Sequence, residues 1–298
     1  MTPATEPNYP ALGRDIKPFV KWAGGKRNLA AQIILRMPPG RLTYHEPFVG
    51  GGAVFFELYK RKRVDHAFLA DQNQDVVNAL VVIKKDVRAL ISALEQHALL
   101  HQKHGAEHYY KVRDAFDDKA SDVERAARFI YLNRTCFNGL YRVNKSGRFN
   151  VPVGDYKNPT ICDAENLRAA HEALQHATVA MGDFEPMMDA AKPGHVCYAD
   201  PPYLPVKRAS KKDGIAATSF TAYDKTPFGV AEHQRLADAF TRAANRGVHV
   251  ILSNSDVALI RDMYKLHRVE EVRAPRAVNS DGAGRGEVTE LLITGRRR

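Results

Sequence analysis

The 298-residue sequence has few cysteines, a single tryptophan and no long apolar run. Its three cysteines, Cys136, Cys162 and Cys197, are too few and too irregularly spaced for a disulfide framework or a zinc site. No apolar run approaches the roughly 18 residues needed to cross a membrane. The opening residues, MTPATEPNYP, lack the basic lead and apolar core of a signal peptide. These absences predict a cytoplasmic protein with no metal and no membrane contact, and we expect a monomer.

Acidic residues are also scarce relative to basic ones. The chain has 44 Lys and Arg against 34 Asp and Glu, which gives a formal net charge of +10. A basic balance favours a polyanionic partner, with nucleic acid first and an acidic membrane surface second.

Short apolar segments that end in polar or turn residues are typical of buried strands. Five of them occupy residues 42–46, 66–71, 178–183, 195–200 and 248–254. Amphipathic stretches predict helices at 53–61 and 231–246, and residues 288–295 predict a further strand. Strands that alternate with helices predict an α/β fold with a mostly parallel sheet, covered on both faces.

The long gap between Asp71 and Thr178 interrupts this alternation. Ser121 and Glu124 form a capping box at the start of a predicted helix. The stretch LYRVNKSGRFNVP then predicts a hairpin with its turn at Gly147, and residues 165–175 predict a helix that returns the chain to the sheet. We therefore predict a main domain of residues 1–76 plus 162–298 and an inserted domain of helices and a hairpin at 77–161.

The stretch HEPFVGGGAVFFEL places Gly50, Gly51 and Gly52 between a predicted strand and a predicted helix. Glycines at such a turn let a ligand approach the backbone closely. Asp71 ends the next strand, 20 residues after Gly51, where an acid can accept hydrogen bonds from a ribose diol. Phe55 stands where a dinucleotide fingerprint needs its third glycine. A nucleoside ligand without a diphosphate, such as S-adenosylmethionine, therefore fits better.

A second glycine pair lies in FVKWAGGKRNLA, where Lys21, Trp22 and Lys26 surround Gly24 and Gly25. This mixture is typical of a loop. A lysine there can face a carboxylate, and the tryptophan can lie beside an adenine ring.

The stretch Asp200-Pro201-Pro202-Tyr203 follows the predicted strand 195–200, at the same sheet edge as Asp71. The two prolines remove N–H donors, which leaves carbonyls and a carboxylate as acceptors. Acceptors beside a flat tyrosine ring suit an exocyclic amino group on a planar base. Holding the hydrogens of that amine would localise its lone pair for attack on a sulfonium methyl. Such a base must first be rotated out of a duplex.

Six of these sequence motifs together are similar to those of a known protein family. KWAGGK, EPFVGGG, LADQN, YLNRTCFNGLYRVNKSGRFNVPVG, DPPY and VILSNSD follow one another along the chain. In this order they resemble the Dam-type, D12 class DNA N6-adenine methyltransferases, over nearly the whole length.

The resemblance implies a methyltransferase (Rossmann-like) fold that transfers a methyl group from S-adenosylmethionine to adenine in double-stranded DNA and releases S-adenosylhomocysteine. It implies that residues Asp200 to Tyr203 hold the flipped adenine. It also implies a set of cofactor-binding residues: Trp22, Lys26, Pro47, Phe48, Gly50, Gly51, Gly52, Asp71, Asp183, Phe184 and Asp200.

For DNA, the resemblance implies that the hairpin enters the duplex and that Arg142 reads a guanine edge. The remaining DNA-binding residues that it implies are Lys21 at the base before the adenine, Phe137 as a wedge, Asn138 on the backbone, Leu140 and Pro152 on thymine methyls, and Asn144. The hairpin is similar to that of GATC-specific members, so we expect GATC as the target. The basic residues of 207–212 are expected to order over bound DNA.

Three alternatives are kept. One is a methyltransferase for RNA, cytosine N4 or a protein glutamine, against which the hairpin and the Asp before Pro-Pro argue. Another is a non-catalytic DNA-binding regulator on the same scaffold, which the retained cofactor positions disfavour. The third is a nicotinamide enzyme, which Phe55 disfavours.

Overall fold

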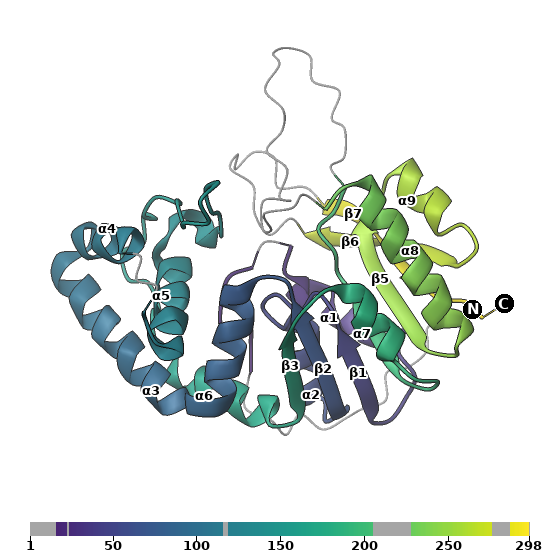
Figure 1. Cartoon of the computed structure of the whole chain (residues 1–298), viewed down its shortest axis with the longest axis horizontal. Coiled ribbons are helices and arrows are strands. Elements are labelled where there is room, and N and C mark those ends of the chain that lie inside the picture. The colour runs from purple at the N-terminus through teal and green to yellow at the C-terminus, as the bar shows by residue number, and fades with distance from the viewer. Residues whose placement is uncertain (1–15, 23, 116–118, 205–227, 276–286, 298) are drawn as a thin grey trace, which may run out of the picture.

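A central β-sheet organises the chain (Figure 1). The computed structural model describes residues 16–22, 24–115, 119–204, 228–275 and 287–297. Within these residues the sheet has seven strands in the order β3-β2-β1-β4-β5-β7-β6. The strands are β1 (Leu42–Glu46), β2 (Val64–Asp71), β3 (Ala177–Met181), β4 (Val196–Ala199), β5 (His249–Ser255), β6 (Arg268–Pro275) and β7 (Glu287–Thr294).

Strands β1 to β5 all run parallel, as predicted. The chain starts in the middle of the sheet at β1, builds β2 and β3 on one side, and then crosses to β4 and β5 on the other. The carboxyl ends of β1 and β4 therefore flank the point where the strand order reverses. Open α/β sheets bind their ligands at this point.

The far edge of the sheet differs from the prediction. Strand β7 is antiparallel to both β5 and β6, and β6 was not predicted. Its sequence, RVEEVRAP, carries four charged residues, and only Val272 among its described side chains is buried. An edge strand buries little and uses charge to block further pairing, so its apolar signal is weak.

Helices cover both faces of the sheet, as predicted. Successive residues of β4 point to opposite sides: Val196 and Tyr198 join one apolar cluster, and Cys197 and Ala199 join the other. The first cluster includes α1 (Ala30–Ile34), α2 (Ala53–Lys60), α3 (Gln74–His104) and α6 (Ala164–Leu174). The second includes α7 (Phe184–Ala190), α8 (Val230–Asn245) and α9 (Ala258–Met263).

The insertion between β2 and β3 contains α3, α4 (Ala106–Asp114), α5 (Asp122–Thr135) and the hairpin. Figure 1 shows α3, α4 and α5 grouped at one end of the molecule. The predicted capping box of Ser121 and Glu124 is confirmed, and Val143 pairs with Phe149 across the predicted hairpin, whose Gly147 has a φ of 74°. The predicted domain boundary at residue 77 falls inside α3, which has non-helical backbone only at Asp86.

The cysteines are free thiols. Cys136 and Cys197 are buried and Cys162 is half-buried, as expected for core residues. No helix in the described part of the chain has the length and apolar character needed to cross a membrane.

A group of histidines joins the helices of the insertion. His97 Nδ1 lies 3.1 Å from His108 Nε2, and the His97 ring stacks on Tyr131 at 4.7 Å. His101 Nδ1 lies 2.9 Å from the hydroxyl of Tyr131. Burial and the facing His108 lower the pKa of His97 to about 4, and burial also lowers the pKa of His108. Both rings are therefore neutral in the folded chain at neutral pH.

Acid should destabilise this part of the fold. Unfolded histidine binds its proton near pH 6.5, so the stability that depends on neutral His97 is complete above that pH and is lost as the pH falls toward 4. The parent should lose unfolding free energy when the pH falls from about 7.5 to about 5. In His97→Phe this loss should be smaller by about 1 kcal/mol, a figure that allows for the partial exposure of His97. His104→Gln, a change at an exposed histidine on the same helix, is the control for urea unfolding at both pH values. Equal acid sensitivity in His97→Phe and the parent would contradict the assignment.

Candidate functional site

The predicted cofactor and catalytic residues meet at one edge of the sheet. The loop with Gly50 to Gly52 follows β1, Asp71 ends β2, Asp183 follows β3, and Asp200 follows β4. Because β3, β2, β1 and β4 are parallel neighbours, their carboxyl ends lie side by side. The site therefore spans the point where the strand order reverses.

Asp71 ties the glycine loop to the start of α3. Its Oδ2 accepts a hydrogen bond from the backbone N–H of Gly50 at 2.9 Å, and its Oδ1 accepts one from Asn73 N–H at 2.9 Å. Asn73 in turn caps α3 with its side-chain oxygen. The predicted ribose acid is thus fixed by two neighbouring turns.

Trp22 packs directly on the glycine loop. Gly50 has a φ of 47°, and a Cβ built there would lie 2.6 Å from the indole Cδ1 of Trp22. The indole also contacts the insertion, where the centroid of the Phe129 ring lies 6.3 Å away and that of the Tyr141 ring lies 5.7 Å away. The Tyr141 hydroxyl donates to Asp75 Oδ2 at 2.6 Å. One aromatic residue therefore links the glycine loop to the hairpin.

Lys26 and Asp200 form a buried ion pair. The Lys26 side chain is only 5% exposed, and its Nζ lies 2.9 Å from Asp200 Oδ1. Nζ also donates to the carbonyl of Gly24 at 2.6 Å, and the hydroxyl of Ser253 donates to the same Oδ1 at 2.7 Å. Two donors hold Oδ1, while Oδ2 makes no hydrogen bond to any other described residue. The lysine of this loop that faces a carboxylate in the structure is Lys26, and its partner is Asp200.

Tyr203 lies beside this pair. Its ring centroid is 4.7 Å from Lys26 Nζ, and its hydroxyl donates to Glu290 Oε2 at 2.7 Å. Burial, followed by the charges of Asp200 and Glu290, raises the pKa of Tyr203 well above its usual value, so the phenol remains a donor. Beyond Tyr203, the Leu204 carbonyl accepts from Ser255 Oγ at 2.8 Å.

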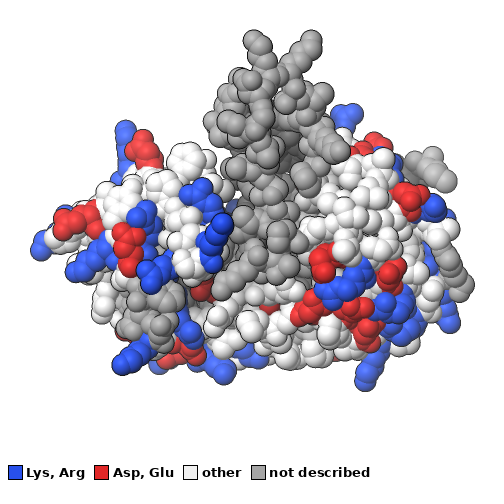
Figure 2. Space-filling model, turned by 45° about the horizontal axis from the view of Figure 1, so that its top comes forward, with Lys and Arg blue, Asp and Glu red and all other residues white. Residues whose placement is uncertain are grey.

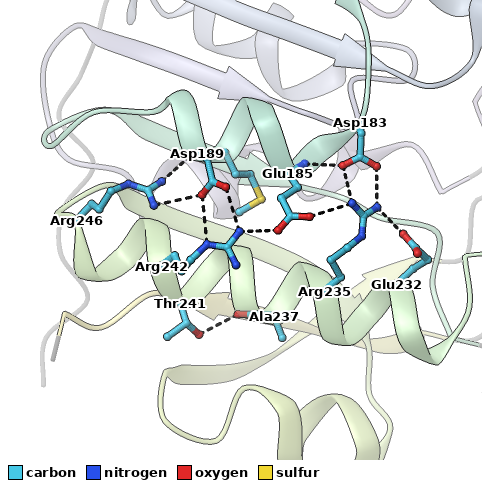
Figure 3. Close-up of polar contacts among 10 residues, drawn as sticks. Asp183, Glu185, Asp189, Glu232, Arg235, Ala237, Thr241, Arg242 and Arg246 are labelled. Atoms are coloured by element: carbon cyan, nitrogen blue, oxygen red, sulfur yellow. Dashed lines mark hydrogen bonds and ion pairs between the residues drawn. The ribbon is translucent and has the colours of Figure 1, made fainter.

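Asp183 caps α7 rather than ending β3, so the predicted strand 178–183 stops at Met181. Arg235 on α8 grips both carboxylate oxygens of Asp183, at 2.9 and 2.7 Å (Figure 3). Glu185 N–H and Gln72 Nε2 donate to the same carboxylate. A carboxylate offers about four acceptor sites, and these bonds use all of them. A ligand contact at Asp183 would therefore come from the backbone or would displace Gln72.

Further salt bridges hold α7 against α8. Arg242 pairs with Glu185 and Asp189, and Arg246 pairs with Asp189. Figure 3 shows these residues arranged in a line between the two helices. This network fixes the turn that carries Asp183.

An aromatic group lies next to this turn. Phe48, which follows Pro47 in the loop after β1, stacks on Phe184 with ring centroids 5.4 Å apart. Phe228 contacts both rings. Phe184 is buried and Phe48 is half-buried. The predicted cofactor-binding residues Phe48 and Phe184 are thus brought together.

Lys21 lies against the base of the hairpin. Asn133, fully buried, accepts from Lys21 N–H at 2.7 Å and donates to the carbonyls of Lys21 and Gly139. The Lys21 ammonium lies 4.1 Å from the centroid of the Tyr156 ring. This amide holds the segment before the glycine pair next to the predicted DNA-binding residues.

The hairpin and the turn before it, Phe137–Gly139, present most of the residues predicted to bind DNA. Phe137 is 46% exposed, an unusual position for a phenylalanine, and its N–H donates to the carbonyl of Pro152. Asn138 is exposed with a φ of 54°, and Leu140 is half-buried. Arg142 is exposed, and its guanidinium donates to both oxygens of Asn150.

The side-chain oxygen of Asn144, an exposed residue predicted to bind DNA, is used within the hairpin. Its Oδ1 accepts from Ser146 N–H, Ser146 Oγ and Arg148 N–H, so the oxygen stabilises the hairpin turn. The basic residues of 207–212 lie outside the described residues. On the described part of the face in Figure 2, acidic and basic side chains are interleaved rather than separated.

Comparison with known proteins identifies the family. Residues 22–278 match the family described as D12 class N6 adenine-specific DNA methyltransferase. The chain belongs to this family. The fold is the α/β methyltransferase fold, as predicted, and the chain is an adenine-specific DNA methyltransferase.

Related proteins align with this chain over nearly its full length. A type II methyltransferase of Lactococcus lactis subsp. cremoris is 38% identical over 287 residues, which cover 94% of this chain and 95% of its own. A type II methyltransferase of Methanocaldococcus jannaschii is 39% identical over 293 residues, covering 94% and 99%. A DNA adenine methylase of Salmonella typhi is 34% identical over 274 residues, covering 92% and 93%. Among solved structures, a precorrin-6y C5,15-methyltransferase of Geobacter metallireducens GS-15 aligns with a TM-score of 0.42 at 10% identity over 98% of this chain and 100% of its own, a likeness too slight to bear on function.

Some residues of this D12 class site were not predicted. Ser253 lies in the stretch VILSNSD, whose polar end was the available signal. Asn133 lies in the stretch YLNRTCFNGLYRVNKSGRFNVPVG, but no role was predicted for it, and Glu290 lies outside the six motifs. The only signal of either residue is a polar side chain inside an apolar strand or helix.

The contact between Trp22 and Gly50 gives a direct test of the glycine loop. Gly50→Ala should lower the free energy of unfolding by about 1 kcal/mol because of the positive φ. Overlap of the new Cβ with the indole should lower it by about 1–3 kcal/mol more. Because Trp22 is the only tryptophan, its fluorescence should shift as well.

Gly40→Ala is the matched control, since Gly40 also has a positive φ but no atom within 4 Å of a built Cβ. Gly40→Ala should lower the free energy of unfolding only by the cost of the positive φ, and it should leave the Trp22 emission unchanged. Identical effects of the two substitutions on unfolding and emission would contradict the packing described.

Proposed function

We propose that this D12 class enzyme transfers a methyl group from S-adenosylmethionine to N6 of an adenine that has been rotated out of double-stranded DNA, within the sequence GATC. The observation that supports the proposal is which of the two carboxylate oxygens of Asp200 is already hydrogen-bonded. Lys26 and Ser253 occupy its Oδ1, Oδ2 is left as an acceptor, and the same Lys26 ammonium lies 4.7 Å from the centroid of the Tyr203 ring. That arrangement suits an amino group on a planar ring.

The residues present fit S-adenosylmethionine. Gly50 has a positive φ and no side chain, which lets Trp22 pack against its backbone and holds the loop after β1 beside Asp71. Asp71 lies beside this loop at the end of β2, where it would accept from the ribose, and Phe184 with Phe48 would border the adenine. The wider set that would hold the cofactor comprises Trp22, Lys26, Pro47, Gly51, Gly52, Asp183 and Asp200. When bound, the cofactor would supply a methyl group activated by its sulfonium.

The chain's own residues would prepare the amine. Asp200 Oδ2 accepts one N6 hydrogen, and a carbonyl of the Asp200-Pro201 segment accepts the other. Both bonds favour a localised lone pair on N6. Pro202 fixes the turn that leads to Tyr203, whose ring stacks on the base. The contribution of these groups is positioning and electrostatics, without a covalent enzyme intermediate.

The insertion would select the DNA site. We propose that residues 77–161 form the target-recognition domain. Arg142 would read a guanine edge, the most frequent specific contact in the major groove, and the exposed Phe137 would enter the stack. Leu140 and Pro152 would contact thymine methyls, Asn138 would contact the backbone, and Lys21 would contact the base before the adenine.

Replacing Asp200 tests the proposal. Parent enzyme should methylate adenines in GATC when incubated with duplex DNA and S-adenosylmethionine. Asp200→Ala should lower the rate at least about 100-fold, because the amine loses its acceptor, while duplex binding stays within a few fold. Labelled methyl transfer with mapping of the modified bases measures the rate and the site.

Asp65→Ala is the control, because Asp65 is an exposed carboxylate at the opposite end of β2. It should retain the parent rate. Normal turnover by Asp200→Ala would refute the role of this carboxylate, and methylation spread over unrelated sequences would refute GATC.

A further inference from the structure

Glu290 brings a second carboxylate into the active site. It lies on β7, 87 residues from Tyr203, and accepts the Tyr203 hydroxyl at 2.7 Å. The same oxygen lies 3.9 Å from Lys26 Nζ, and the Glu290 side chain is only 19% exposed. β7 reaches this position because it is inserted between β5 and β6, where Glu290 pairs with Ser255.

Neutralising Lys26 does not explain this carboxylate. Asp200 already pairs with Lys26 at 2.9 Å, a full ångström closer than Glu290. The short contact of Glu290 is with the phenol. A hydrogen bond to a carboxylate is about twice as strong as one between neutral groups. Burying the Glu290 carboxylate is costly. Since its short contact is with the Tyr203 hydroxyl, the bond that offsets this cost is the one that orients the Tyr203 ring.

We propose that Glu290 is a positioning residue for the target base. By fixing the hydroxyl of Tyr203, it holds the ring in the plane on which the extruded adenine stacks, next to Asp200 Oδ2. The inference rests on the proposed function, since it assigns the base to the face of Tyr203. Loss of the bond leaves the ring free to turn, and a small misplacement of the base slows transfer.

The test uses Glu290→Ala, Tyr203→Phe and the double variant in the full-length chain. Each single variant removes the same hydrogen bond, and Tyr203→Phe keeps the ring. We expect each to lower the single-turnover methylation rate by about 10–100-fold, and the double variant to be no slower than either single variant. 2-Aminopurine at the target position should show an altered bound-state fluorescence in all three. Cofactor binding, followed through Trp22 emission, should stay within about threefold.

Two further variants separate positioning from charge. Glu290→Gln keeps an acceptor for the phenol and should retain the rate within about fivefold. Glu270→Gln removes another partly buried carboxylate, on the neighbouring strand β6, that pairs with Arg36 and Arg268, and it should have no effect.

Full activity of Glu290→Ala, additive losses in the double variant, or equal losses in Glu290→Gln and Glu290→Ala would each overturn the inference. If Glu290→Ala does not fold, the rate of Tyr203→Phe decides, because it removes the same bond from the other partner. Failure of the parent chain to methylate duplex DNA would instead refute the proposed function.

Discussion

The ion pair between Lys26 and Asp200 is the contact on which the site depends. It joins the first loop of the described chain to the end of β4 across the point where the strand order reverses. Removing one partner of such a buried pair typically costs about 3–5 kcal/mol, because the remaining charge is left without compensation. The pair also orients Asp200, since Lys26 and Ser253 hold its Oδ1 and its Oδ2 makes no hydrogen bond to any other described residue.

The parts of the molecule that meet at this pair come from distant segments. Trp22 and Lys21 lie just before Lys26 and contact the insertion through Tyr141, Asn133 and Gly139. The glycine loop and the hairpin are therefore packed against the same short segment. This packing gives a physical route by which the glycine loop and the hairpin can hold each other in place.

The fold could be predicted wherever burial leaves a periodic signal. Strands β4 and β5 are buried along nearly their whole length, so each has a continuous apolar run followed by polar residues. β3 lies at the opposite edge of the sheet and buries only Ala177, yet it keeps the short apolar run ATVAM. β6 lies at the edge and carries charges, so the same pattern is missing. The predicted domain boundary at residue 77 follows the change in pattern along the sequence, and helix α3 continues through it with non-helical backbone only at Asp86. A helix that packs on two units gives no local signal for the division between them.

The site could be predicted where a residue type and its place at a strand end coincide, as at Asp71, Asp200 and the glycine loop. Glu290 and Asn133 could not, because their roles arise from pairing between segments far apart in the sequence, and no local pattern records it. Asp183 was predicted at the end of a strand but caps α7, and its engagement by Arg235 on α8 was not predicted.

The most direct measurement is a structure of the enzyme with a cofactor analogue and a GATC duplex. The account predicts the N6 nitrogen of an extruded adenine within about 3 Å of Asp200 Oδ2, with the ring of Tyr203 stacked on the base. An adenine that remains in the duplex, or an N6 nitrogen far from Asp200, would contradict it.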